Sequence, residues 1–335
     1  MNTQKIMMLI LLVSVGSYSA SAKELTATQR SEIIDHVIDQ LANRYVDPNL
    51  GQKAAQAIKQ KKENQTYDAL DTQASLIEAL RADMVATTRD KQIQLKHQSE
   101  ADSGWMHPAV KMDFGGAQMD DRQKKKIILQ FVNYGLINPQ ILEGNIGCVG
   151  ILEFFSPEIA PDVYRIIDKT MQSFQGCSAV ILDLSFCDRG GDPEVMMYLA
   201  SYFLDGEGSQ LLYVAFNREN QKVSEYRIRM DITGKRMPNI PLYIVVGSKT
   251  SSTGEMLAYG LQKVGRAKVV GETSAGAAYG TDTIGIGHDI MMVLPVKRLS
   301  HVKSKTNWEG TGVIPDVPTP ADKALDVAKN LIRNK

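Results

Sequence analysis

The second half of the chain alternates short apolar runs with amphipathic segments, and this alternation constrains the fold more than any other feature. The apolar runs cover residues 149–155, 179–186, 211–216, 242–247, 267–271 and 290–296. Helical patterns fill residues 159–174, 193–204 and 253–264, and a further helix is expected at residues 320–333. Strands that alternate with helices form an α/β domain with a largely parallel sheet. We therefore expect such a domain from Asn145 onwards.

The segment from Thr26 to Asp90 carries the spacing of amphipathic helices instead. Its first helix places apolar residues at the 3–4 intervals of one buried stripe, and Asp47-Pro48 ends that helix. A second helix is expected around residues 51–64 and a third from about residue 71 to residue 87. Three short helices with tight connections predict a small bundle.

The first 22 residues have the layout of a secretory signal peptide. Lys5 supplies a positive charge, residues 6–13 are apolar, and Ser19-Ala-Ser-Ala22 offers the small residues of a cleavage site. The apolar run is too short for a stable membrane anchor, although a retained anchor is the alternative interpretation. We therefore expect cleavage near Ala22, a periplasmic or secreted mature protein, and no membrane span in the mature chain.

The charge balance and the residue counts argue against several function classes. Acidic and basic residues number 38 each, so no overall field draws the chain to nucleic acid. The basic run Arg122-Gln-Lys-Lys-Lys126 is interpreted as the solvated face of a helix. Five histidines and three cysteines leave little material for a metal cluster. We expect no metal, no cofactor and no nucleic-acid partner.

Two of the cysteines stand at the entrances of apolar runs. If the runs that begin after Cys148 and Cys177 are neighbouring parallel strands, the two sulfur atoms start these strands side by side. An exported protein can keep a disulfide there. Three free thiols fit the pattern equally well, and Cys187 has no partner in either case.

Two junctions between strands and turns draw attention as chemical sites. The run 179–186 leads into Gly190-Gly191, a pair that lets backbone N–H groups point outward together, as an oxyanion hole requires. An ordinary tight turn explains the pair too. Ser252 stands where a strand gives way to a helix, next to free N–H groups and the positive end of the helix dipole. Such a placement suits a nucleophile, but Ser252-Thr-Gly-Glu255 is also a capping box in which the serine only caps the helix.

A third segment, Asn307-Trp-Glu-Gly-Thr-Gly312, surrounds an acidic residue with a tryptophan and a glycine-rich turn. These neighbours should hold Glu309 rigidly and partly out of water. Such a carboxylate is suited to orient a catalytic base. Pairing with Lys303 or Lys305 is the structural alternative.

Taken together, many short motifs of the chain match one known family. The matching stretches are Asn133-Tyr-Gly135, Gly144-Asn-Ile-Gly147, Ala179-Val-Ile-Leu-Asp-Leu184, Ser201-Tyr-Phe203, residues 250–259, Gly265-Arg-Ala267, Val270-Gly-Glu-Thr273 and residues 306–316, with Arg44-Tyr-Val-Asp-Pro48 and Arg89-Asp-Lys91 in the first half. The chain resembles peptidase family S41, the family of the tail-specific proteases, in the branch that includes the repeats of interphotoreceptor retinoid-binding protein. The resemblance covers nearly the whole mature chain.

The resemblance implies an α/β core of the crotonase-like (ClpP-like) type preceded by a small helical bundle. Its expected division is a signal peptide at 1–22, a helical domain at 23–105, a connecting segment at 106–144 and a peptidase-like core at 145–335. About 50 residues separate Asp90 from Asn145, too few for the PDZ domain that some relatives insert there. The expected partner is a peptide or protein substrate.

The resemblance also implies roles for particular residues. Ser252 becomes the nucleophile of a serine-type peptidase, and Glu309 becomes the carboxylate partner of a histidine base. The backbone N–H of Thr253, together with Gly190 and Gly191, becomes the oxyanion hole.

Both bases of the family are missing from this chain. Relatives with a histidine base carry it in an Asp-x-His motif, where this chain reads Asp90-Lys-Gln92, and an amide takes no proton near neutral pH. Relatives with a lysine base carry it 25 residues after the serine, where this chain has Ala277. His97 is a substitute only if its loop folds back to the serine. We expect a peptidase whose activity is impaired by Gln92. The alternative is an inactive peptidase fold that binds a peptide or an apolar ligand.

Overall fold

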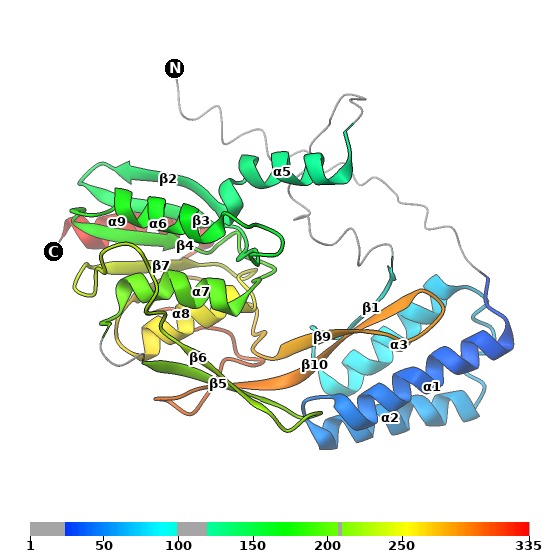
Figure 1. The fold of residues 1–335 in the computed structure, drawn as a ribbon. Coiled ribbons are helices and arrows are strands. Elements are labelled where there is room, and N and C mark those ends of the chain that lie inside the picture. The colour runs from blue at the N-terminus through cyan, green and yellow to red at the C-terminus, as the bar shows by residue number, and fades with distance from the viewer. Residues whose placement is uncertain (1–23, 99–118, 207–209, 335) are drawn as a thin grey trace. The chain divides into compact units, whose positions relative to one another are not determined.

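The computed structural model describes residues 24–98, 119–206 and 210–334, and these divide into two units (Figure 1). We call the first the helical unit; its described residues are 24–43, 47–98 and 283–294. We call the second the core unit; it holds the other described residues. The predicted signal peptide lies outside the described residues.

Helices dominate the helical unit. Its elements are α1 (Ala27–Arg44), α2 (Pro48–Glu63), α3 (Gln73–Thr88) and β1 (Gln94–His97). The Asp47 side chain caps α2 by accepting hydrogen bonds from the backbone N–H groups of Asn49 and Leu50, and Pro48 takes the first helical position. The apolar stripe of α1 is buried as expected, so the predicted three-helix arrangement is confirmed.

The core unit is built on a sheet with the strand order β11-β8-β7-β4-β3-β2. Its strands are β2 (Leu136–Leu142), β3 (Ile146–Ile151), β4 (Ala179–Asp183), β7 (Leu242–Val246), β8 (Lys268–Gly271) and β11 (Val317–Pro318). All neighbouring strands run parallel except β2 and β3. The largely parallel sheet that the sequence predicts is confirmed.

The core unit also contains helices. They are α5 (Asp121–Phe131), α6 (Val163–Ser173), α7 (Pro193–Ala200), α8 (Thr253–Lys263) and α9 (Ala321–Arg333), with short 3-10 turns at Asn133–Gly135 and Ser201–Phe203. Ala324 and Ala328 of α9 pack on one face of the sheet against Ile181 and Val245. The basic run lies in α5, where Arg122 and Lys126 are exposed as expected. No helix among the described residues is long and apolar enough to cross a bilayer.

A second sheet is antiparallel, with the order β1-β10-β5-β6 and with β9 paired to β10. Its remaining strands are β5 (Leu211–Asn217), β6 (Val223–Arg227), β9 (Gly280–Gly285) and β10 (Ile290–His301). The apolar runs at 211–216 and 290–296 are β5 and β10 of this antiparallel sheet, so not every apolar run belongs to the largely parallel sheet. An apolar run indicates burial of a strand but not the direction of its neighbour.

The expected boundary at residue 105 lies outside the described residues, and the division into units departs from the expected boundary at residue 144. Residues 119–144 belong to the core unit because β2 pairs with β3. Residues 283–294 belong to the helical unit because the start of β10 pairs with β1. The hairpin of β9 and β10 therefore runs from one unit into the other and back, which a linear pattern does not reveal.

The disulfide considered between Cys148 and Cys177 is absent, and the three cysteines are free thiols. In the register of β3 and β4, Cys148 lies opposite Ile181, whereas Cys177 precedes Ala179, the first paired residue of β4. A register difference of four residues between Ile181 and Cys177 corresponds to about 13 Å along a strand. The two sulfur atoms therefore do not start the strands side by side.

Candidate functional site

Ser252 lies at the junction between β7 and α8, as the sequence predicts. The carboxylate of Glu255 accepts a hydrogen bond from the Ser252 backbone N–H at 2.9 Å, and the capping box is present. The Ser252 backbone nevertheless adopts φ 53° and ψ −120°. An ordinary N-cap residue has an extended backbone, and a non-glycine residue with positive φ is strained. This conformation distinguishes Ser252 from a simple cap.

The Gly190-Gly191 turn approaches the start of α8 closely. Both glycines have positive φ, 75° and 110°, and the turn is fixed by hydrogen bonds to the backbone of Phe154. A β-carbon at position 190 would lie 2.5 Å from the Thr253 nitrogen and 2.9 Å from the Ser252 Oγ. The Thr253 hydroxyl also donates to the Gly191 carbonyl at 2.7 Å. The structure thus brings together the four residues that the sequence analysis connected.

The backbone N–H groups at this meeting point are available for a ligand. Among the described residues, no acceptor takes the backbone N–H of Gly190, Gly191 or Thr253. The N–H of Thr253 also belongs to the first turn of α8, where the helix dipole is positive. Such donors beside a serine hydroxyl are suited to bind a negatively charged oxygen.

Glu255 is fully buried directly behind Ser252, a feature that sequence reasoning treated only as half of a capping box. Besides the Ser252 N–H, its carboxylate accepts from the Ser274 hydroxyl at 2.5 Å and from the backbone N–H groups of Gly276 at 2.6 Å and Ala277 at 2.8 Å. Burial raises the pKa of this carboxyl, and these hydrogen bonds oppose the rise. The contacts to residues 274–277 could not be foreseen, because their sequence separation is about 20 residues.

Glu309 lies on the loop that follows β10, and its carboxylate is held by backbone groups. Its Oε2 accepts from the Ala278 N–H at 2.7 Å, while its own N–H donates to the Asn307 side chain at 3.1 Å. The neighbouring Trp308 is only 1% exposed. These contacts are the environment of the carboxylate that the sequence predicts to be rigid and partly desolvated. Ala278, the donor to Glu309, directly follows Ala277, whose N–H donates to Glu255.

A small pocket of about 60 Å³, partly open to solvent, is lined by Ser252 and Thr253. Its apolar wall includes Ala215, Met256, Leu299 and Trp308. Ala277 lines the same pocket, so the position of the lysine base in some relatives faces it with a methyl group.

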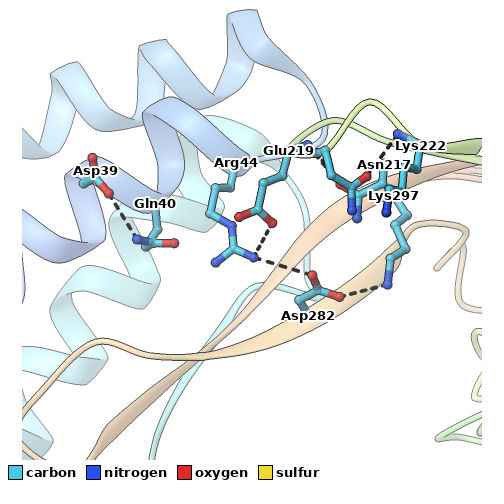
Figure 2. Close-up of polar contacts among 9 residues, drawn as sticks. Asp39, Gln40, Arg44, Asn217, Glu219, Lys222, Asp282 and Lys297 are labelled. Carbon is cyan, nitrogen blue, oxygen red and sulfur yellow. Dashed lines mark hydrogen bonds and ion pairs between the residues drawn. The ribbon is translucent and has the colours of Figure 1, made fainter.

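Lys297 brings a charged side chain to the wall of this pocket. Its Nζ lies 2.9 Å from the carboxylate of Asp282, which is also 3.6 Å from Arg44, and Arg44 binds Glu219 at 2.6 Å (Figure 2). The ammonium group is therefore engaged in a chain of ion pairs.

Gln92 and His97, the two residues considered in connection with the base, belong to the helical unit. The Gln92 N–H donates to the buried carboxylate of Asp90 at 2.8 Å. His97 is the last residue of β1 and pairs with Ile290, so it lies on a strand and not on a loop that folds back. Because an extended chain advances about 3.3 Å per residue, His97 lies roughly 16 Å along the backbone from Gln92. The role of His97 as an alternative base stays a prediction from the sequence.

A largely buried carboxyl, Glu153, lies beside the Gly190-Gly191 turn. It precedes Phe154, the residue that holds Gly190, and its side chain is 12% exposed and 3.9 Å from Arg189. Burial raises the pKa of Glu153 from 4.5 to about 7; Arg189 lowers it and Asp188 raises it by smaller amounts. No group of three or more metal-ligating side chains gathers among the described residues.

The raised pKa of Glu153 makes a prediction about stability. The unfolded carboxyl loses its proton near pH 4.5 and the folded one near pH 7, so stability is highest at low pH and falls across this window. The expected loss is about 3 kcal/mol. Glu153→Gln should remove this loss, so its stability should exceed that of the wild type by about 3 kcal/mol at pH 8 and should show no gain at pH 4. Urea unfolding followed by tryptophan fluorescence measures both. An unchanged pH slope in Glu153→Gln, matching that of the exposed control Glu63→Gln, would contradict the assignment.

Comparison with known proteins places this site in a family context. The profile described as Peptidase family S41 matches residues 145–319. A lipoprotein from Streptococcus agalactiae has a similar fold, with a TM-score of 0.61, 14% identity, and coverage of 92% of this chain and 98% of that one. The photosystem II D1 C-terminal processing protease has a similar fold with a TM-score of 0.53 and 15% identity, and the match covers 89% of this chain and 94% of that one. For the tricorn protease the TM-score is 0.52 and the identity 13%, and the match covers 91% of this chain and 37% of that one. The expected fold class, an α/β core preceded by helices, is confirmed.

Proposed function

Because the chain belongs to peptidase family S41, we propose that it is a serine-type peptidase that acts on peptide bonds in an exported compartment, with Ser252 as its nucleophile. The observation that carries this proposal is the close approach of Gly190 to Ser252 and Thr253, together with N–H groups of Gly190, Gly191 and Thr253 that no acceptor takes among the described residues. The exported location rests on the signal-peptide pattern of residues 1–22.

The proposed reaction is acyl transfer through the serine. The Ser252 Oγ attacks the carbonyl carbon of the peptide bond and gives up its proton, and the carbonyl oxygen becomes an oxyanion held by the three N–H groups. The carbon–nitrogen bond then breaks, and the amine leaves with a proton. Water hydrolyses the resulting ester and restores the serine. Glu309 orients whichever base carries the proton.

The proton transfer is the weak step of this mechanism. The family positions for a base hold Gln92 and Ala277, and neither side chain accepts a proton near neutral pH. Removal of the base from a serine triad costs several orders of magnitude in rate and leaves residual catalysis from the oxyanion site. We therefore infer a slow peptidase.

A fluorophosphonate probe tests the nucleophile directly, because it reacts with an activated serine and mimics the tetrahedral intermediate. We expect slow labelling of the full-length protein that is confined to the peptide containing Ser252 and is about tenfold or more above that of Ser252→Ala. Ser251→Ala is the matched control, since it removes the neighbouring hydroxyl and should leave labelling unchanged. Equal labelling of the wild type and Ser252→Ala by mass spectrometry would refute the role of Ser252.

The absence of both family bases favours a second candidate function. In it the pocket beside Ser252 binds a peptide or an apolar ligand that the protein does not cleave. The apolar wall formed by Ala215, Met256 and Leu299 supports such binding. Binding of a peptide without any Ser252-dependent labelling would favour this candidate over the slow peptidase.

A further inference from the structure

We propose that Glu255 is a positioning residue that holds Ser252, the loop 274–278 and the loop bearing Glu309 in one arrangement. The inference rests on the proposed role of Ser252 as nucleophile. It extends that proposal to a buried side chain whose contacts reach all three parts of the site.

The first contact fixes the conformation of the serine. By accepting the Ser252 N–H at 2.9 Å, Glu255 occupies this donor, so that it is not available to a ligand. The backbone at φ 53° is strained for a serine and needs support from its surroundings. The N–H of the next residue, Thr253, stays without an acceptor in the described part of the chain. Glu255 thus helps decide which backbone donor remains available to a ligand.

The other contacts reach across the site to the loop 274–278. Glu255 accepts from the Ser274 hydroxyl and from the N–H groups of Gly276 and Ala277. Ala278, the next residue, donates its N–H to Glu309. Two consecutive backbone N–H groups therefore bind the two carboxylates.

The loop bearing Glu309 is attached to the same hub by further hydrogen bonds. The Ser274 Oγ accepts from the Val313 N–H at 2.7 Å while donating to Glu255. The Gly310 N–H donates to the Gly276 carbonyl at 2.9 Å. A continuous network of hydrogen bonds therefore connects Ser252 through Glu255 to residues 309–313.

A carboxylate is the side chain that suits this hub. Its two oxygens offer about four acceptor sites, and four donors occupy them. In Glu255→Gln an NH₂ group replaces one oxygen. This group is itself a donor, so it cannot accept the hydrogen bonds of the donors that the oxygen bound. Leaving a buried donor unsatisfied costs free energy, so the neighbouring backbone must move. Displacement of a reacting group by about 1 Å costs on the order of 100-fold in rate.

The test compares Glu255→Gln with the matched control Glu272→Gln in the full-length protein. Glu272 also accepts backbone N–H groups, from Ser248 and Ala321, but at the surface of the core unit. We expect fluorophosphonate labelling of Ser252 to fall about 100-fold in Glu255→Gln and less than about twofold in the control. In the labelled protein, the ³¹P NMR signal of the phosphonate on Ser252 should also shift, because its oxygen meets rearranged N–H groups. Wild-type labelling in a folded Glu255→Gln would overturn the proposal.

Two further measurements keep the proposal testable. Hydrogen–deuterium exchange of the segment 248–256 reports the Ser252 N–H without any need for activity. Faster exchange of this N–H in Glu255→Gln supports the proposal even if Ser252 does not label, whereas unchanged exchange overturns it. Should Glu255→Gln not fold, Ser274→Ala removes one of the four donors and the link to Val313. In Ser274→Ala we then expect slower labelling of Ser252 or faster exchange of its N–H than in the wild type. Labelling and exchange that both equal those of the wild type would contradict the inference.

Discussion

Replacement of Gln92 by histidine is expected to raise the rate of Ser252 acylation by about 10²- to 10⁴-fold, the usual contribution of a general base. Family S41 members with a histidine base carry it at this position of the Asp-x-His motif. The rest of the motif is intact here, because the buried Asp90 carboxylate accepts the N–H of residue 92 at 2.8 Å. The substitution therefore returns an imidazole to the position of the family motif, in a local backbone that Asp90 already holds. The rate of fluorophosphonate labelling and the cleavage of a casein substrate measure the gain.

The controls for this prediction separate a restored triad from an unrelated effect. Gln92→Asn keeps an amide and should gain nothing, and the gain in Gln92→His should vanish when Ser252→Ala or Glu309→Gln is added. His97→Gln should leave the gain intact, because His97 is fixed on β1. Cleavage that appears only in Gln92→His identifies the natural protein as an inactive peptidase fold. A folded Gln92→His variant that labels no faster than the wild type contradicts the assignment of position 92.

The parts of the fold that sequence could predict are those set by local pattern. The buried stripe of α1, the Pro48 start of α2 and the parallel strands β3, β4, β7 and β8 follow from periodicity and from helix-start signals. Strands β6 and β9 have mostly exposed or alternately exposed residues and carry no apolar run. They pair with their neighbours along the chain, β5 and β10, but without an apolar run their residues give no strand signal of their own.

The candidate site divides in the same way. Ser252 and the Gly190-Gly191 turn lie at junctions that local pattern locates, but a helix cap and a tight turn explain them equally well, and only the family resemblance connected them to chemistry. The hub at Glu255 was missed because three of its four ligands come from residues 274–277. The supposed pairing of Cys148 with Cys177 failed for a related reason, because the register of β3 and β4 depends on the whole sheet.

The substitution Gly190→Ala is expected to reduce labelling of Ser252 by about 10²- to 10³-fold, the usual effect of losing an oxyanion-hole donor. Two physical effects act on an alanine at this position. Its backbone at φ 75° costs about 1–2 kcal/mol for any residue with a β-carbon. Its β-carbon would also lie 2.5 Å from the Thr253 nitrogen and 2.9 Å from the Ser252 Oγ, so the turn and the serine must move apart.

Gly176→Ala separates these two effects. Gly176 has nearly the same backbone conformation, φ 82°, but a β-carbon there would meet no atom within 4 Å. Both variants should therefore lose about 1–2 kcal/mol of stability from backbone strain, and only Gly190→Ala should lose reactivity at Ser252. The comparison is sharpest in the Gln92→His background, where labelling is fast enough to reveal a 100-fold loss. If Gly190→Ala labels as fast as Gly176→Ala in this background, the Gly190-Gly191 turn does not help to bind the oxyanion. The proposed role of its N–H groups is then contradicted.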